Sequence, residues 1–166
     1  MATNVLASIL LVKVREQAGR TEHLLDRIPP DRIDWRPLQN AMPLGELLGH
    51  LLEAFSGFCA AFYGLRRERL AHFQRLRKLP VNHRCEVEEA RTRIREYMAH
   101  IEEGFTVLTD EDLARRVPTV FAPAGEPFLS VLLGNLEHVV NHKHQLFFYL
   151  KMLGVPVSTP DLYHGT

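Results

Sequence analysis

Residues 133–156, with the sequence LGNLEHVVNHKHQLFFYLKMLGVP, contain the end of the longest helical pattern in the chain. This pattern begins near Pro127 and continues to Leu153, and its apolar residues recur with a period of about 3.6 residues. Gly154 follows as a residue that easily adopts the backbone conformation found after a helix, and Pro156 prevents the helix from continuing. We therefore predict a long last helix.

Two histidines lie inside this predicted helix at a spacing that places them on one face. His138 and His142 are four residues apart, so their side chains are separated by about 40° around the helix axis and can bind one metal ion. Gln145 falls on the same face one turn further on, whereas His144 points about 200° away from His142 and is excluded as a ligand. Such a pair alone is more often structural than metal-binding, because buried histidines usually find backbone or carboxylate partners.

His50 occupies the middle of a second predicted helix, among Leu47, Leu48 and Leu51. A histidine in so apolar a setting faces the core or has a partner there. Glu53 lies three residues later, where it would serve as a fourth metal ligand, as an acceptor for an imidazole N–H, or as a base acting on a metal-bound water. Spacing along the chain does not decide whether His50 joins the pair on the last helix.

The chain has nine histidines and two cysteines. We predict surface or structural roles for the remaining histidines, which are His23, His72, His83, His100 and His164. His83 and Cys85 form a two-residue pair without a second half, so a structural role is favoured there as well. Cys59 and Cys85 have no CxxC spacing and predict free thiols in a reducing compartment.

The remaining sequence predicts more helices and no strands, because no segment shows sustained alternation of apolar and polar residues. Three further helices are expected at about residues 4–28, 43–63 and 86–108. Pro29 and Pro30 end the first, and Thr109 is expected to cap a short turn after the third. Residues 117–127 predict an irregular connector. The expected fold is a single all-α domain over residues 1–166, with four principal helices and at least one long connection.

Composition limits the classes of partner. Twenty basic and twenty acidic residues cancel, so no overall field attracts nucleic acid or a membrane surface. The basic segment from Arg66 to Lys78 predicts a solvated helix extension or crossover connection in preference to a nucleic-acid patch. The apolar residues 5–14 are too few for a membrane span and lack the flanking features of a secretion signal. We expect a cytoplasmic protein with neither nucleic acid nor membrane as partner.

The order of the motifs resembles the DinB/YfiT-like superfamily of metal-dependent proteins. The sequence Trp35-Arg36-Pro37 forms a loop, and its Trp35 is predicted to close one end of the bundle; His50 follows on the second helix, and the last helix carries the H-x3-H pair followed by Gln145. The resemblance implies a four-helix bundle with up-down-down-up direction and a homodimer. It also implies that His50, His138 and His142 bind a divalent transition metal, with nickel or zinc expected.

One departure from the family pattern follows the last of these histidines. Lys143 and His144 stand where the family usually has Arg-Gly. A role tied to that arginine is therefore not carried over to this chain, and the missing glycine changes the bulk beside Gln145.

Three imidazoles leave a metal ion with at least one open position, which is the catalytic pattern rather than the structural one. The resemblance includes S-transferases that use low-molecular-weight thiols such as bacillithiol, and a mycothiol-dependent isomerase. We predict a metal-dependent transferase or hydrolase, with transfer of a thiol to a small electrophile as the leading hypothesis. Glu53 or Gln145 would support the ligands. The alternative is a non-catalytic dimeric helical module whose metal serves stability or sensing.

Overall fold

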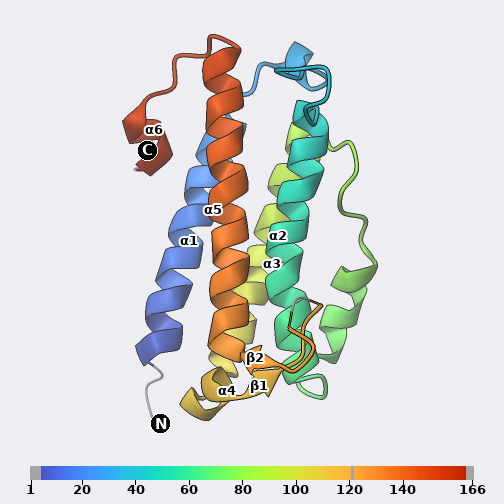
Figure 1. Cartoon of the computed structure of the whole chain (residues 1–166), viewed down its shortest axis with the longest axis vertical. Coiled ribbons are helices and arrows are strands. Elements are labelled where there is room, and N and C mark those ends of the chain that lie inside the picture. The colour runs from blue at the N-terminus through green and yellow to red at the C-terminus, as the bar shows by residue number, and fades with distance from the viewer. Residues whose placement is uncertain (1–4, 121, 164–166) are drawn as a thin grey trace.

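Four long helices form the body of the protein in the computed structural model, which describes residues 5–120 and 122–163. They are α1 (Val5–Leu25), α2 (Leu44–Leu65), α3 (Val87–Thr106) and α5 (Phe128–Met152). Helices α1 and α5 run in one direction, and α2 and α3 run in the other (Figure 1). The expected all-α, up-down-down-up bundle is confirmed. The predicted start of the first helix at Asn4 lies outside the described residues.

Helix α2 lies at the centre of the packing. It contacts α3 on one side and α5 on the other, while α1 also packs against α3 and α5. Three phenylalanines of α2, Phe55, Phe58 and Phe62, are completely buried. Gly104 of α3 faces Phe62, and a Cβ atom added at this glycine would lie only 2.4 Å from the phenylalanine ring. The glycine therefore allows α3 to approach α2 closely.

A long crossover joins the parallel helices α2 and α3 and contains the 3-10 helix η2 (Ala71–Lys78). Its apolar residues Leu70, Phe73 and Leu76 are buried against the bundle. Of its cations, Arg66 pairs with Asp112 of the next connection. The expectation of a crossover for the basic segment is met, and the segment is held by its buried side chains.

The connection between α3 and α5 begins with the short helix α4 (Asp110–Ala114), which Thr109 caps as predicted. Thr109 accepts a hydrogen bond from the Asp112 backbone, and the Asp112 side chain accepts one from the Thr109 backbone. The irregular connector predicted at 117–127 is partly wrong. Strands β1 (Arg116–Val117) and β2 (Glu126–Pro127) pair in antiparallel orientation, and two-residue strands are too short to show an alternating pattern.

Two short helices were not expected from the sequence. The 3-10 helix η1 (Pro30–Arg32) follows α1, and helix α6 (Thr159–Tyr163) folds back beside α1 (Figure 1). Asp161 of α6 lies 2.9 Å from Nε2 of His23. Among the residues that the structure describes, no helix is both long and apolar enough to cross a membrane.

Candidate metal centre

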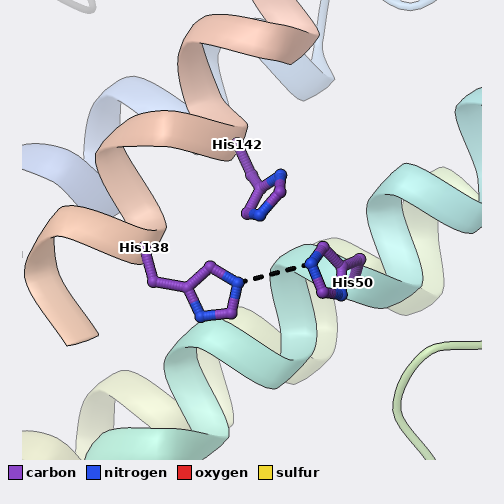
Figure 2. Close-up of side chains that lie close together, drawn as sticks. All are labelled: His50, His138 and His142. Carbon is purple, nitrogen blue, oxygen red and sulfur yellow. Dashed lines mark hydrogen bonds between the residues drawn. The ribbon is translucent and has the colours of Figure 1, made fainter. Parts of the chain in front are cut away.

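Three imidazole rings converge between α2 and α5. His50 projects from α2, and His138 and His142 project from successive turns of α5 toward it (Figure 2). The Nε2 atoms of His50 and His138 are 3.4 Å apart. The ring centroid of His50 lies 5.1 Å from that of His138 and 4.3 Å from that of His142. One nitrogen from each ring lies within 4.8 Å of the others.

These distances fit one metal ion. Two nitrogens bound tetrahedrally to zinc at about 2.1 Å lie about 3.4 Å from each other, which matches the separation of the His50 and His138 Nε2 atoms. All three side chains are partly exposed rather than sealed in the core. The residues present therefore fit a divalent transition metal with an open coordination position.

The tautomer of His50 is set by two acceptors on the same side of its ring. Its Nδ1 lies 2.6 Å from Oδ1 of Asn82 and 3.1 Å from Oε2 of Glu53. Both oxygens accept hydrogen bonds, so the proton resides on Nδ1 and the lone pair of Nε2 is free for a metal. Of the three roles considered for Glu53, its position supports that of an acceptor for the imidazole N–H.

The tautomer of His142 is set by a chain of hydrogen bonds along α5. The Tyr149 hydroxyl donates to the backbone oxygen of Met42 at 3.1 Å, and it accepts from the Gln145 amide at 3.2 Å. The Gln145 oxygen consequently faces His142, whose Nδ1 lies 2.9 Å away and donates to it. This arrangement leaves Nε2 of His142 available. Trp35 packs edge-to-face on Tyr149 at 5.7 Å, which closes this end of the bundle as predicted.

Asn82 reaches His50 because the end of the crossover docks directly on α2. The Asn82 backbone donates to the Gly49 oxygen, and the Cys85 backbone donates to the Gly45 oxygen, both at 3.0 Å. A Cβ atom added at Gly49 would lie 1.9 Å from the His83 oxygen, so only glycine permits this contact. Asn82 itself has a φ of 56°, a conformation that asparagine tolerates better than most residues.

Burial lowers the pKa of His138 and of His142. For His138, the neighbouring His142 and His50 lower the pKa further. For His142, the hydrogen bond to Gln145 works in the opposite direction, while His50 again lowers the pKa. Neutral imidazoles are the form that binds metals, so the environment favours the binding form.

A groove of about 780 Å³ lies beside His138, which contributes to its lining. Small residues of α2 and α5 leave the space open, including Gly57, Ala60, Ala61 and Gly134. The lining is mostly apolar, with Asn135 and Asn141 among its polar members. The groove is large enough for a small organic molecule beside the candidate metal centre.

The fold agrees with comparisons against known proteins. A profile of the DinB superfamily matches residues 13–146, which is most of the chain. The chain belongs to the DinB superfamily. The crystal structure of a DinB-like protein, YjoA from Bacillus subtilis, is similar in fold with a TM-score of 0.67 and 19% sequence identity; the match covers 89% of this chain and 96% of that one. A search of curated proteins found no match.

The other histidines of this DinB-superfamily chain lie elsewhere. His144 bonds to the Val140 backbone oxygen and stays outside the converging group. His23, His72 and His83 each contact a carboxylate, and His100 contacts a backbone oxygen. His164 lies outside the described residues.

Lys143, which replaces the usual arginine of the family, lies under α6 and donates to the Leu162 backbone oxygen. Its burial lowers its pKa to about 8. Two residues that support the site were missed in the sequence. Tyr149 is four residues beyond Gln145, so helical spacing would have revealed it. Asn82 lies in a connection without periodicity, and the sequence carries no signal that it meets His50.

Proposed function

We propose that His50, His138 and His142 bind a divalent transition metal, with zinc or nickel expected, and that the chain uses it to transfer a low-molecular-weight thiol to a small electrophile. One observation carries this proposal: three imidazoles, two of them with Nδ1 held by an acceptor so that Nε2 is available, converge beside an apolar groove that His138 helps to line. A metal site of purely structural purpose is normally closed by four protein ligands.

The bound metal would supply an open coordination position that holds a thiol as its thiolate. The protein performs the remaining tasks. Asn82 and Glu53 hold His50, and Gln145 holds His142, so that each presents Nε2. The mostly apolar groove accommodates the electrophile next to His138. In the reaction, the thiol proton passes to solvent, the sulfur forms a bond to carbon, and the leaving group departs with the electron pair of the broken bond.

Size and polarity of the groove define the expected electrophile. Its glycine and alanine lining accepts an apolar body, such as a halogenated aromatic ring. A Gly134→Leu substitution would fill part of this space, because nothing lies within 4 Å of a Cβ atom added at this residue. We expect the KM for the electrophile to rise while metal content stays unchanged. Gly64→Leu on α2 serves as the control, since Gly64 is equally open but lies outside the groove.

The test is an activity assay on untagged protein that has been stripped with a chelator and reloaded with zinc or nickel. Cysteine, glutathione and bacillithiol are each combined with a chromogenic aryl halide. We expect turnover that requires the metal, is lost in His138→Ala and is retained in His144→Ala. If the metal binds but no thiol is transferred above the rate of free metal, the catalytic part of the proposal is wrong. If no metal binds, the site itself is wrong.

A further inference from the structure

A second group of metal-binding side chains lies at the end of the crossover. His83, Cys85 and Glu89 each offer one ligand atom, and these atoms lie within 4.8 Å of one another. Nε2 of His83 is 2.9 Å from Oε1 of Glu89. The residues come from two elements, because His83 and Cys85 precede α3 and Glu89 lies in its first turn.

The backbone holds these side chains in a fixed arrangement. The Cys85 backbone donates to the Gly45 oxygen of α2, and the His83 backbone lies against Gly49 so closely that no larger residue fits. Glu89 is anchored by α3 itself. Packed elements of the fold therefore fix the backbone positions from which the three side chains meet.

Without a cation the cluster is only partly satisfied, and the Cys85 thiol donates to the Glu86 backbone oxygen at 3.4 Å. Cys85 is completely buried, and Nδ1 of His83 is buried without a hydrogen bond to any of residues 5–120 and 122–163. The Glu89 carboxylate faces both the His83 ring and the thiol. Arg93 lies 3.7 Å from Glu89, but its guanidinium also bonds to the Pro80 oxygen and the Tyr97 hydroxyl. A divalent cation would balance one thiolate and one carboxylate completely.

The arrangement argues against a reactive cysteine. Burial raises the pKa of the Cys85 thiol to about 12, and the neighbouring Glu89 acts in the same direction. A buried thiol of this kind is inert as a nucleophile. Coordination reverses the situation, because a metal ion deprotonates a thiol that it binds.

We propose that His83, Cys85 and Glu89 form a second transition-metal site, independent of the three histidines, at the junction of the crossover with α3. Nitrogen, sulfur and oxygen donors in one site suit zinc and its spectroscopic substitute cobalt. Water would complete the coordination, since the His83 and Glu89 side chains are 30% and 40% exposed. The site does not use His50, His138 or His142. It therefore goes beyond the proposed function and can be tested independently of it.

Titration with Co²⁺ tests this site, using full-length protein from which a chelator has removed all metal. Thiolate bound to Co²⁺ gives a near-ultraviolet charge-transfer band that imidazole ligands do not give. We expect this band to saturate at one equivalent per chain beyond any metal taken up by the three histidines, and to persist in His142→Ala. Cys85→Ser abolishes it. Cys59→Ser keeps it, and this is a matched control because Cys59 is also buried with a pKa raised to about 12.

A milder variant separates loss of the ligand from loss of the fold. His83→Gln removes a partly exposed ring, and we expect Co²⁺ affinity measured from the same band to fall at least about 10-fold while circular dichroism stays unchanged. The proposal is overturned if the wild type shows no band, if the band survives Cys85→Ser, or if a folded His83→Gln protein binds Co²⁺ as tightly as the wild type.

Discussion

The two candidate metal sites are linked through the adjacent residues Asn82 and His83 but use different donors and surroundings. The three-histidine site uses nitrogen donors from two long helices and borders an apolar groove. The site at His83, Cys85 and Glu89 uses mixed donors at the end of a connection and contains a fully buried sulfur. The first is suited to bind a substrate beside the metal, whereas the second joins the end of the crossover to the first turn of α3.

A single peptide bond joins the two regions. Asn82 accepts the hydrogen bond that orients His50, and the next residue, His83, belongs to the second cluster. The contact of this segment with Gly45 and Gly49 positions both. The helices therefore determine where the ligands of the first site lie. The docked connection determines which nitrogen of His50 is available to a metal.

The largest effect is expected at the helix-borne ligands. His142→Ala removes one of three metal-binding nitrogens, so we expect Zn²⁺ affinity to fall at least about 100-fold, beyond the effect of losing a supporting residue. Isothermal titration of chelated protein measures it. His144→Ala is the matched control, because His144 lies two residues away and bonds to the Val140 oxygen. Equal affinities in the two variants would contradict the assignment of ligands.

A second substitution breaks the docked connection while leaving the helix ligands intact. Gly49→Ala places a Cβ atom 1.9 Å from the His83 oxygen. We expect the free energy of unfolding to fall by about 3 kcal/mol, at the upper end of the usual cost of overpacking. Gly64→Ala on the same helix meets nothing within 4 Å and should stabilise by up to about 1 kcal/mol through helix propensity. Chemical denaturation compares them, and equal stabilities would show that the docking contact is unimportant.

The link between the two regions is tested at Asn82. Asn82→Gly keeps the positive φ but removes the acceptor for His50, whereas Asn82→Asp keeps an acceptor. We expect the glycine variant to bind Zn²⁺ about 10- to 100-fold more weakly, as for other residues that orient a ligand from behind, and the aspartate variant to stay close to wild type. If both variants bind like wild type, Asn82 does not orient His50.

A smaller effect is expected at the far end of the other hydrogen-bond chain. Tyr149→Phe frees the Gln145 amide to rotate, and its oxygen is then no longer held toward His142. We expect a loss of about 10-fold in Zn²⁺ affinity and about 1 kcal/mol in stability from the lost hydrogen bond. The affinity of Phe148→Leu, an exposed neighbour, should not change. An unchanged Zn²⁺ affinity in Tyr149→Phe would show that the hydrogen bonds from Tyr149 through Gln145 do not orient His142.

The smallest effect is a pH dependence of the metal-free protein. The pKa values of His138 and His142 are lowered below their usual 6.5 in the fold. Well above pH 6.5 the two histidines are neutral in both the folded and the unfolded state and contribute no slope. As the pH falls below 6.5, the unfolded chain takes up protons first, so the free energy of unfolding decreases until the pH passes the folded pKa values. Denaturation of His138→Ala/His142→Ala should show a flatter profile in this range, and an unaltered slope would contradict the lowered pKa values.

Features that depend on nearby residues could be predicted from the sequence, whereas features that depend on distant contacts mostly could not. The helix positions and the shared face of His138 and His142 follow from a period of 3.6 residues, which depends only on nearby backbone. The contact of His138 with His50 joins two residues that are 88 positions apart in the sequence. Only the family resemblance suggested this contact. Asn82 was not predictable, because its contact depends on a connection without periodicity docking on two glycines.

Two further features departed from simple pattern rules for physical reasons. Lys143 is almost fully buried although lysines usually lie at the surface; its ammonium group bonds to the Leu162 oxygen of α6. The spacing of His83 and Cys85 favours a structural role, because no second pair of ligand residues follows at a spacing typical of metal sites. Glu89, one turn into α3, completes a cluster that the CxxC and HxxxH spacings do not describe.

Anomalous diffraction from crystals loaded with zinc, recorded at the zinc absorption edge, tests the central claim most directly. We expect a peak within bonding distance of the Nε2 atoms of His50, His138 and His142, while Nδ1 of His50 remains on Asn82 and Nδ1 of His142 on Gln145. A peak bonded through either Nδ1 atom would contradict the assigned tautomers. No peak among the three rings would contradict the metal centre itself.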